Sequence, residues 1–279
     1  MPSETTEEEV STRTCKNCPS RLTGPYCSVC GQRDFDFKQD WKSLLEEYVS
    51  SMFNFDGKVP RGIFCLLFKP GHNSREFLDG KRFSQIPPIR LYLFTSLLFF
   101  LFATNVDLID GTDYDKSITE MIESVPKPTP EDSEMEAYLT SKFDDPRQFV
   151  NDFEDWLPKV ALIAVPLFAI VTRLVFWRRN LIYIEHLIIA MHMISFYMMW
   201  RIISTFASLP IGLFSKPASE LFIDISNFWI VIYPVFSFRR IFDLTWMKAI
   251  GASLVIEFCS LLLLAATVSG AIGIAFLLA

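Results

Sequence analysis

Four cysteines near the N-terminus have the spacing of a metal-binding site. They form two C-x-x-C pairs separated by eight residues: Cys15, Cys18, Cys27 and Cys30. A tight turn places two thiolates on one side of an ion, and a second turn completes the tetrahedron that zinc prefers. Because four thiolates leave no position for water, we predict a single structural zinc ion. Two disulfides in an exported domain, or an unmetallated redox pair, are the alternatives.

The residues around these pairs suit a compact ribbon. Gly31 follows the second pair directly, where a backbone with positive φ is needed, and a short loop with Gly24 and Pro25 joins the two pairs. We therefore predict a small zinc ribbon over residues 15–33. The polar and acidic residues 1–14 before it are predicted to be a disordered tail.

A second group of reactive side chains lies within or next to long apolar stretches. Its members are Glu185, His186, His192, Glu257 and Arg173. Ionisable groups in hydrocarbon are costly unless they are paired, so each is a candidate site residue. From their depths we expect His192 to contact Glu257, and Glu185 to pair with Arg173. A proton relay, a metal cluster or a polar cavity is one interpretation, and polar contacts that hold helices together are the other.

The elements that position these side chains are long apolar helices. Apolar residues make up 51% of the chain, and charges are concentrated outside stretches that can cross a ~30 Å hydrocarbon layer. The sequence therefore predicts an all-α polytopic membrane protein with about five transmembrane helices. We place them near residues 89–106, 157–177, 181–207, 221–238 and 247–270.

Every second turn between the predicted spans carries basic residues, and this pattern predicts the orientation of the chain in the membrane. Lys81 and Arg82 precede the first span, Arg90 lies at its start, and two further basic groups follow the second and fourth spans. By the positive-inside rule, the N-terminus is cytoplasmic and the C-terminus lies outside. The thiols then lie in a reducing compartment. We also expect Lys81, Arg82 and Arg90 to contact anionic lipid headgroups at the membrane surface.

Two further regions complete the predicted organisation. Residues 34–88 contain apolar stripes at helical spacing but no stretch long enough to span, so they are predicted to be amphipathic or interfacial helices. The transmembrane bundle covers 89–279 and includes an acidic extracytoplasmic insertion at 107–156. Residues 107–155 hold 15 acidic and 4 basic side chains, so we expect no nucleic acid as a partner. The long apolar stretches make the lipid bilayer the expected partner.

Ordered motifs along the chain resemble a family. They are Cys15-x-x-Cys18, Gly24-Pro-Tyr-Cys27-x-x-Cys30-Gly-Gln32, Lys69-Pro-Gly71, Gly80-Lys-Arg82, Pro87-Pro-x-Arg90-Leu-Tyr92 and Tyr183-x-Glu185-His186-Leu with His192 downstream. The chain resembles a bacterial family of inner-membrane proteins, classed as a domain of unknown function, with an N-terminal zinc ribbon. The resemblance implies a bacterial inner membrane and no known activity. Similar proteins often carry another histidine shortly after His192, where this chain has Ile194 or Ser195.

The sequence favours a binding function over catalysis. It contains no G-x-S-x-G, P-loop or H-E-x-x-H motif. We expect a membrane-embedded scaffold, sensor or assembly factor whose cytosolic ribbon docks a protein partner, and a homo-oligomer is compatible with the sequence. A small transporter or channel that uses a polar face of Glu185, His192 and Glu257 is the alternative. A membrane enzyme that acts on lipid or envelope precursors is the third hypothesis.

Overall fold

The computed structural model describes residues 13–34, 58–103 and 146–278, and all regular elements in these ranges are helices. They are α2 (Lys58–Phe68), α3 (His72–Leu78), α4 (Pro88–Ala103), α7 (Pro146–Val175), α8 (Tyr183–Phe214), α9 (Lys216–Phe242) and α10 (Trp246–Leu278). The predicted tail and most of the acidic insertion lie outside the described residues, as do residues 35–57 of the amphipathic region. The predicted all-α class is confirmed.

Four of the helices are long and apolar enough to cross a membrane. The spanning segments are Pro158–Val175 of α7, the whole of α8 and α9, and Trp246–Thr267 of α10. They confirm the polytopic prediction at the positions of the last four predicted spans. The first predicted span corresponds to α4, which has 16 residues. At ~1.5 Å per residue the described part of α4, which ends at Ala103, is about 24 Å long, compared with ~30 Å for a hydrocarbon layer.

The helices extend beyond the predicted span boundaries. α8 continues through Pro210 to Phe214, and α10 continues to Leu278 as a single helix. α7 begins at Pro146, so the last residues of the predicted 107–156 insertion belong to a helix that enters the bundle. The predicted boundaries followed the usual length of a span. Backbone hydrogen bonding instead continues α8 and α10 through further, mostly apolar residues and extends α7 back into the polar residues before its apolar part.

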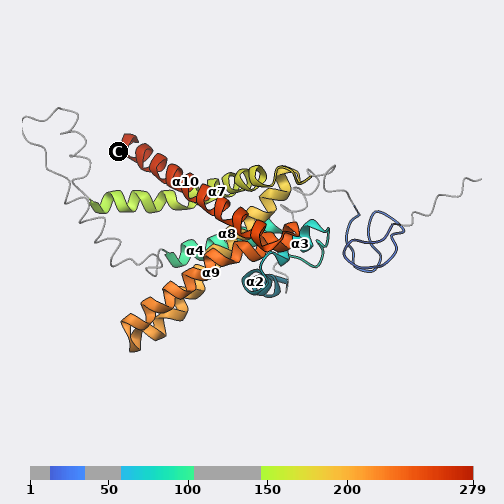
Figure 1. Cartoon of the computed structure of the whole chain (residues 1–279), viewed down its shortest axis with the longest axis horizontal. Helices are drawn as coiled ribbons and strands as arrows, with labels where there is room; N and C mark the ends of the chain where they lie inside the picture. The colour runs from blue at the N-terminus through green and yellow to red at the C-terminus, as the bar shows by residue number, and fades with distance from the viewer. Residues whose placement is uncertain (1–12, 35–57, 104–145, 279) are drawn as a thin grey trace, which may run out of the picture.

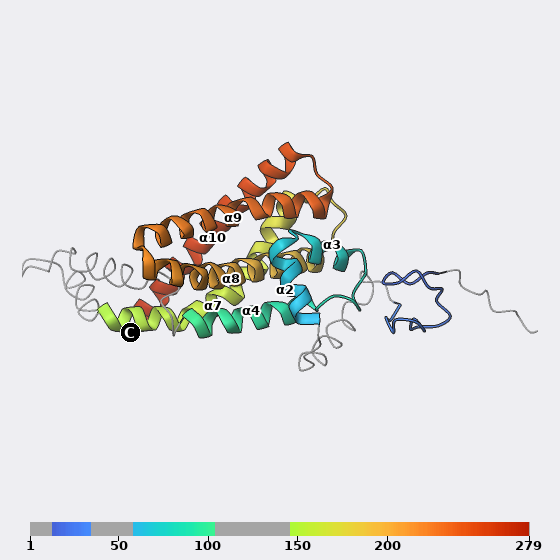
Figure 2. The same cartoon turned by 90° about the horizontal axis from the view of Figure 1, so that it is seen from below.

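Helix α8 is the centre of the bundle. It contacts α4, α7 and α9, while α10 crosses α7 and α9 on the other side (Figures 1 and 2). The apolar part of α8 has the largest buried share among the four spanning helices. Within the core, the rings of Phe196 on α8 and Tyr233 on α9 stack with centroids 3.4 Å apart. Small residues such as Ala190, which is fully buried, let the helices approach closely.

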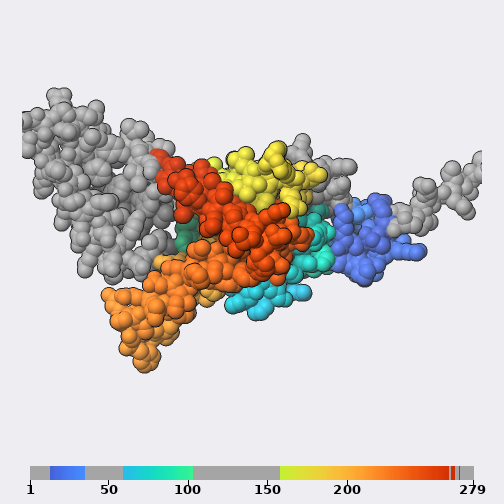
Figure 3. Space-filling view, viewed as in Figure 1, coloured from blue at the N-terminus to red at the C-terminus, as the bar shows by residue number. Residues whose placement is uncertain are grey.

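The N-terminal ribbon and the two short helices lie together at one end of the bundle. α2 and α3 both pack against α8, and α3 also packs against α9. Figure 3 shows the ribbon resting against the region of α3, while the turn between α8 and α9 projects from the body of the molecule. The C-terminal end of α10 lies at the end of the bundle opposite the ribbon (Figure 1).

Candidate metal centre

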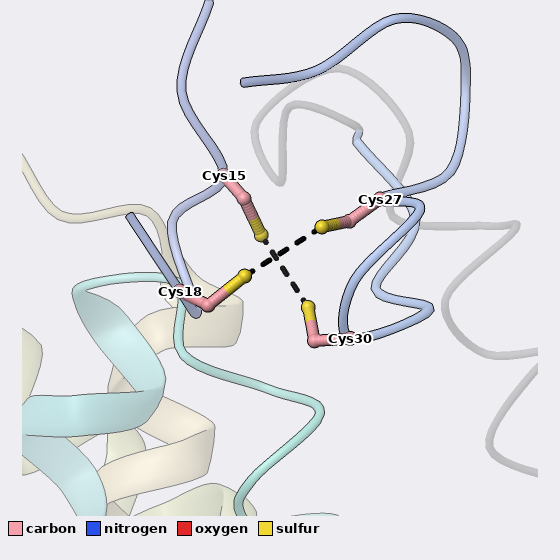
Figure 4. A group of neighbouring side chains, drawn as sticks. All are labelled: Cys15, Cys18, Cys27 and Cys30. Carbon is pink, nitrogen blue, oxygen red and sulfur yellow. Dashed lines mark hydrogen bonds between the residues drawn. The ribbon is translucent and has the colours of Figure 1, made fainter. Parts of the chain in front are cut away.

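The four predicted cysteines come together as one cluster. Their Sγ atoms all lie within 4.8 Å of one another and could hold a metal ion. The distances Cys15 Sγ–Cys30 Sγ and Cys18 Sγ–Cys27 Sγ are both 3.6 Å, so each short contact joins one cysteine of each C-x-x-C pair. Figure 4 shows the four side chains converging on a common centre. All four are free thiols, which favours a metal site over two disulfides.

Two small hairpins hold the cysteines in this arrangement. A β-bridge between Thr14 and Arg21 closes the first hairpin, and one between Tyr26 and Arg33 closes the second. The turn of the second hairpin ends at Gly31, which has a φ of 77°. This left-handed conformation is the one that glycine adopts without strain, as predicted from its place after the second cysteine pair.

Ser20 contacts two of the four thiols and is absent from the predicted metal site. Its Oγ lies 3.0 Å from the Sγ of both Cys18 and Cys27. The hydrogen bond from Ser20, followed by the backbone N–H groups of Cys30 and Val29, lowers the pKa of Cys27 to about 6. Burial raises the pKa of Cys30 to about 11. Ser20 therefore favours the thiolate form that a metal ion requires.

Gln32 attaches the ribbon to the loop between α3 and α4. Its side-chain amide donates to the carbonyl of Gly80 at 2.8 Å, and its side-chain oxygen accepts from the N–H groups of Arg82 and Phe83 at 3.1 Å each. Gln32 is buried, so these bonds are shielded from water. The ribbon thus rests on the bundle through specific backbone contacts.

The predicted membrane-surface residues Lys81, Arg82 and Arg90 all lie in or just after this loop and are half-buried. Lys81 forms an ion pair with Glu76 at 2.8 Å, which raises the pKa of Lys81. The guanidinium of Arg82 lies 5.8 Å from the centre of the Phe77 ring. Part of this basic group therefore stabilises the loop that receives the ribbon.

Helix α3 connects that loop to the membrane helices. Arg75 donates to the carbonyl of Ile241 at 3.0 Å and to the carboxylate of Asp243 at 2.6 Å, at the C-terminal end of α9. In return, Arg240 of α9 donates to the carbonyl of Pro70 at 2.6 Å. A cation at a helix C-terminus binds the carbonyls that have no partner within the helix. These hydrogen bonds hold α3 against the C-terminal end of α9.

The polar residues predicted inside the membrane have separate partners. The Glu185 carboxylate accepts a hydrogen bond from the backbone N–H of Ile182 at 2.7 Å and caps the start of α8. Arg173 is exposed, and among the described residues it forms no ion pair with Glu185. The expected Glu185–Arg173 pair is therefore not formed, because the capping bond occupies the carboxylate.

The expected His192–Glu257 contact is not formed either. His192 Nδ1 lies 3.0 Å from Ser74 Oγ of α3, and Glu257 accepts a hydrogen bond from the Tyr197 hydroxyl at 2.5 Å. His186 is fully buried, and neither of its ring nitrogens has a hydrogen-bond partner among the described residues. The structure therefore does not bring the predicted polar face of α8 and α10 together. Ser74 lies 118 residues from its partner His192 in the chain, and Tyr197 lies 60 residues from its partner Glu257. No local sequence pattern therefore identified them.

One comparison with known proteins gives a match. Residues 56–100 match a family model described as a protein of unknown function, DUF3667. No curated protein and no solved structure matches the chain. The matched segment includes α2, α3, the loop that receives the ribbon and nearly all of α4. Together with four apolar helices and the cysteine cluster, it fits an uncharacterised membrane family.

Proposed function

We propose that this chain is a membrane-embedded scaffold or assembly factor whose zinc ribbon docks a protein partner on the cytoplasmic face of a bacterial inner membrane. One observation carries the proposal. The ribbon is attached to the bundle through Gln32, yet the side chains of Tyr26 and Val29 are 59% and 73% exposed. An apolar surface held at a fixed place beside the membrane is suited to binding another protein.

Zinc is the metal that best suits the four thiols. With Zn–S bonds of about 2.3 Å in a tetrahedron, neighbouring sulfurs are about 3.8 Å apart. The two short Sγ–Sγ distances in the ribbon are 3.6 Å, close to this value. Since four thiolates close the coordination sphere, the ion's part is to hold the two hairpins together. The proposed docking surface then depends on metal binding.

The exposed residues have the character of a protein interface. Tyr26 and Val29 belong to the second hairpin, on either side of Cys27. Aromatic residues with one apolar and one polar end are common at protein interfaces. The second hairpin also contains Gln32, so the surface that binds a partner and the residue that docks the ribbon share one rigid unit. The polar face needed for the transport alternative is not formed, and we propose no transport function.

The docking proposal can be tested by site-specific crosslinking in cells. A photoreactive amino acid at Val29 is expected to give a discrete crosslinked protein, whereas the same group at the exposed Thr23 of the ribbon loop is not. Cys27→Ser removes one metal ligand, so it should abolish the Val29 crosslink. The Gln32→Ala variant is expected to keep the metal but weaken the crosslink, because the ribbon is no longer held beside the bundle. Equal crosslinking at both positions, or persistence of the band in Cys27→Ser, contradicts the proposal.

A further inference from the structure

A cavity of about 230 Å³ lies between α7, α8, α9 and α10, away from the ribbon. Its walls are formed mainly by aliphatic and aromatic side chains, including Phe168 of α7 and Leu261 of α10. Leu261 is 62% exposed, so the cavity reaches the lipid-facing surface of α10. Cavities of about 150 Å³ hold a benzene molecule, so this one has room for a ring with a small substituent.

Glu257 is the one acidic side chain among the residues that line this cavity, and Tyr197, Ser260 and Thr267 are its other polar members. Glu257 of α10 lines it together with Tyr197 of α8, whose hydroxyl donates to the Glu257 carboxylate at 2.5 Å. Bonds between neutral oxygens are usually about 2.7–2.8 Å long, whereas a hydroxyl on a charged carboxylate gives about 2.5–2.7 Å. The Tyr197 hydroxyl is therefore placed to stabilise the charged form of Glu257 when a cation enters the cavity.

Among the residues that the structure describes, no positive group pairs with Glu257. No arginine, lysine or histidine lines the cavity, and Glu257 forms no ion pair with any described residue. An ion in hydrocarbon is costly unless it is paired. The cavity thus combines one uncompensated acid with apolar walls, and the rings of Phe168 and Tyr197 can also attract a cation through their faces.

We propose that this cavity binds a small lipophilic cation, an ammonium group joined to one apolar ring or a short chain. The positive charge pairs with Glu257, and the apolar part fills the space between α7 and α10. Such a molecule partitions into the bilayer and can reach the cavity beside Leu261. The site is independent of the ribbon and of the docking function.

The test uses the purified full-length protein in phosphatidylcholine nanodiscs and radiolabelled benzyltrimethylammonium, whose charge does not change with pH. Saturable binding is expected, with Kd at least tenfold weaker in Glu257→Gln and several-fold weaker in Tyr197→Phe, which keeps the ring. The neutral isostere neopentylbenzene should compete at least tenfold less well than the cation. Glu220→Gln, which changes an exposed acid of α9 outside the cavity, should bind as the wild type does.

Three results would overturn the inference: no saturable binding to the wild type, equal binding to Glu257→Gln, or equal competition by the neutral isostere. The last result would mark the cavity as a site for neutral apolar molecules. If Glu257→Gln does not fold, Leu261→Trp provides the test, because it narrows the opening and leaves the acid in place. Unchanged binding by a folded Leu261→Trp variant would also contradict the proposal.

Discussion

Each cysteine of the ribbon can supply one of four ligands to a metal ion, so one substitution should open the coordination sphere. We predict that Cys27→Ser loses the bound metal, because a hydroxyl is a poor replacement for a thiolate. Ser28→Ala is the matched control, since Ser28 is exposed in the same turn and offers no ligand atom to the cluster. Metal content per chain by mass spectrometry should fall from one to near zero in the first variant and stay at one in the second.

Ser20 contacts two of the four thiols but is not one of the four cysteine ligands of the cluster. Removing its hydroxyl in Ser20→Ala deletes two contacts of 3.0 Å to sulfur. Loss of such a supporting group typically weakens metal affinity about 10-fold or more. We therefore expect Ser20→Ala to bind one metal ion with about 10-fold lower affinity in a chelator competition. An unchanged affinity would show that the hydroxyl has no part in metal binding.

The two histidines of α8 should respond differently to substitution. His192→Leu leaves the Ser74 hydroxyl buried without its partner, so we expect a loss of about 1 kcal/mol in stability. His186→Leu removes a buried ring that has no hydrogen-bond partner among the described residues, so we expect it to be neutral or stabilising. Unfolding in detergent measures both variants.

A double substitution separates hydrogen bonding from packing at His192. When Ser74→Ala is added to His192→Leu, both partners become apolar, and most of the lost stability should return. If the double variant is less stable than His192→Leu alone, the Ser74–His192 hydrogen bond is not the origin of the effect. If His192→Leu instead keeps full stability but loses function in cells, His192 has a role beyond packing.

At the scale of elements, the insertion of α3 between α8 and α9 depends on one glycine. Gly71 has a φ of 71°, and a Cβ atom placed on it would lie 2.7 Å from the Ser237 carbonyl oxygen of α9. Gly71→Ala must therefore displace one backbone from another. We predict a loss of about 1–3 kcal/mol, from the strained φ and the overlap together.

Gly251 provides the control for this prediction. It lies within α10, and a Cβ atom there would meet nothing within 4 Å. Gly251→Ala should leave the melting temperature unchanged or raise it, since alanine is favoured over glycine inside a helix by up to about 1 kcal/mol. Equal melting temperatures for both alanine variants would show that α3 does not approach α9 as closely as described.

The prediction from sequence succeeded for features that depend on neighbouring residues. The cysteine spacing, the positive φ of Gly31 and the four long apolar helices are all set locally. It failed for the partners of His192 and Glu257, because partner choice depends on how helices are rotated and on what lies between them. α3 is only seven residues long and mostly polar, so its sequence indicates an interfacial segment. Its burial depends on hydrogen bonds to distant backbone groups, which no periodicity reveals.

At the scale of the whole molecule, the described turns place basic residues at the end that carries the ribbon. Arg75 of α3 contacts the C-terminal end of α9, where Arg239 and Arg240 lie. Phe176, beside the turn that holds Arg178 and Arg179, stacks on Phe242 at 3.8 Å. The α7–α8 turn and the end of α9 are thus neighbours beside the ribbon. By the positive-inside rule, this is the end expected in the cytoplasm.

The number of membrane crossings gives the sharpest test of this orientation. The ribbon and the C-terminal end of α10 lie at opposite ends of the bundle (Figure 2), which requires an odd number of crossings. Among the described residues four helices are long enough to span, so α4, whose described part has 16 residues and lies beside α8, must supply the fifth crossing. A short span is accommodated by local thinning of the bilayer at a modest cost.

We predict that alkaline phosphatase fused after Ala279 is active, and that green fluorescent protein at the same position is not fluorescent when exported in the unfolded state. The same reporters at the N-terminus should give the reverse result. Truncated fusions after residue 103 and after residue 180 locate the first two crossings separately: the first should report from outside and the second from the cytoplasm. A cytoplasmic signal after residue 103 together with a cytoplasmic C-terminus would mean that α4 does not cross. The ribbon and the end of α10 would then lie on the same side of the membrane, which the arrangement of the helices does not allow.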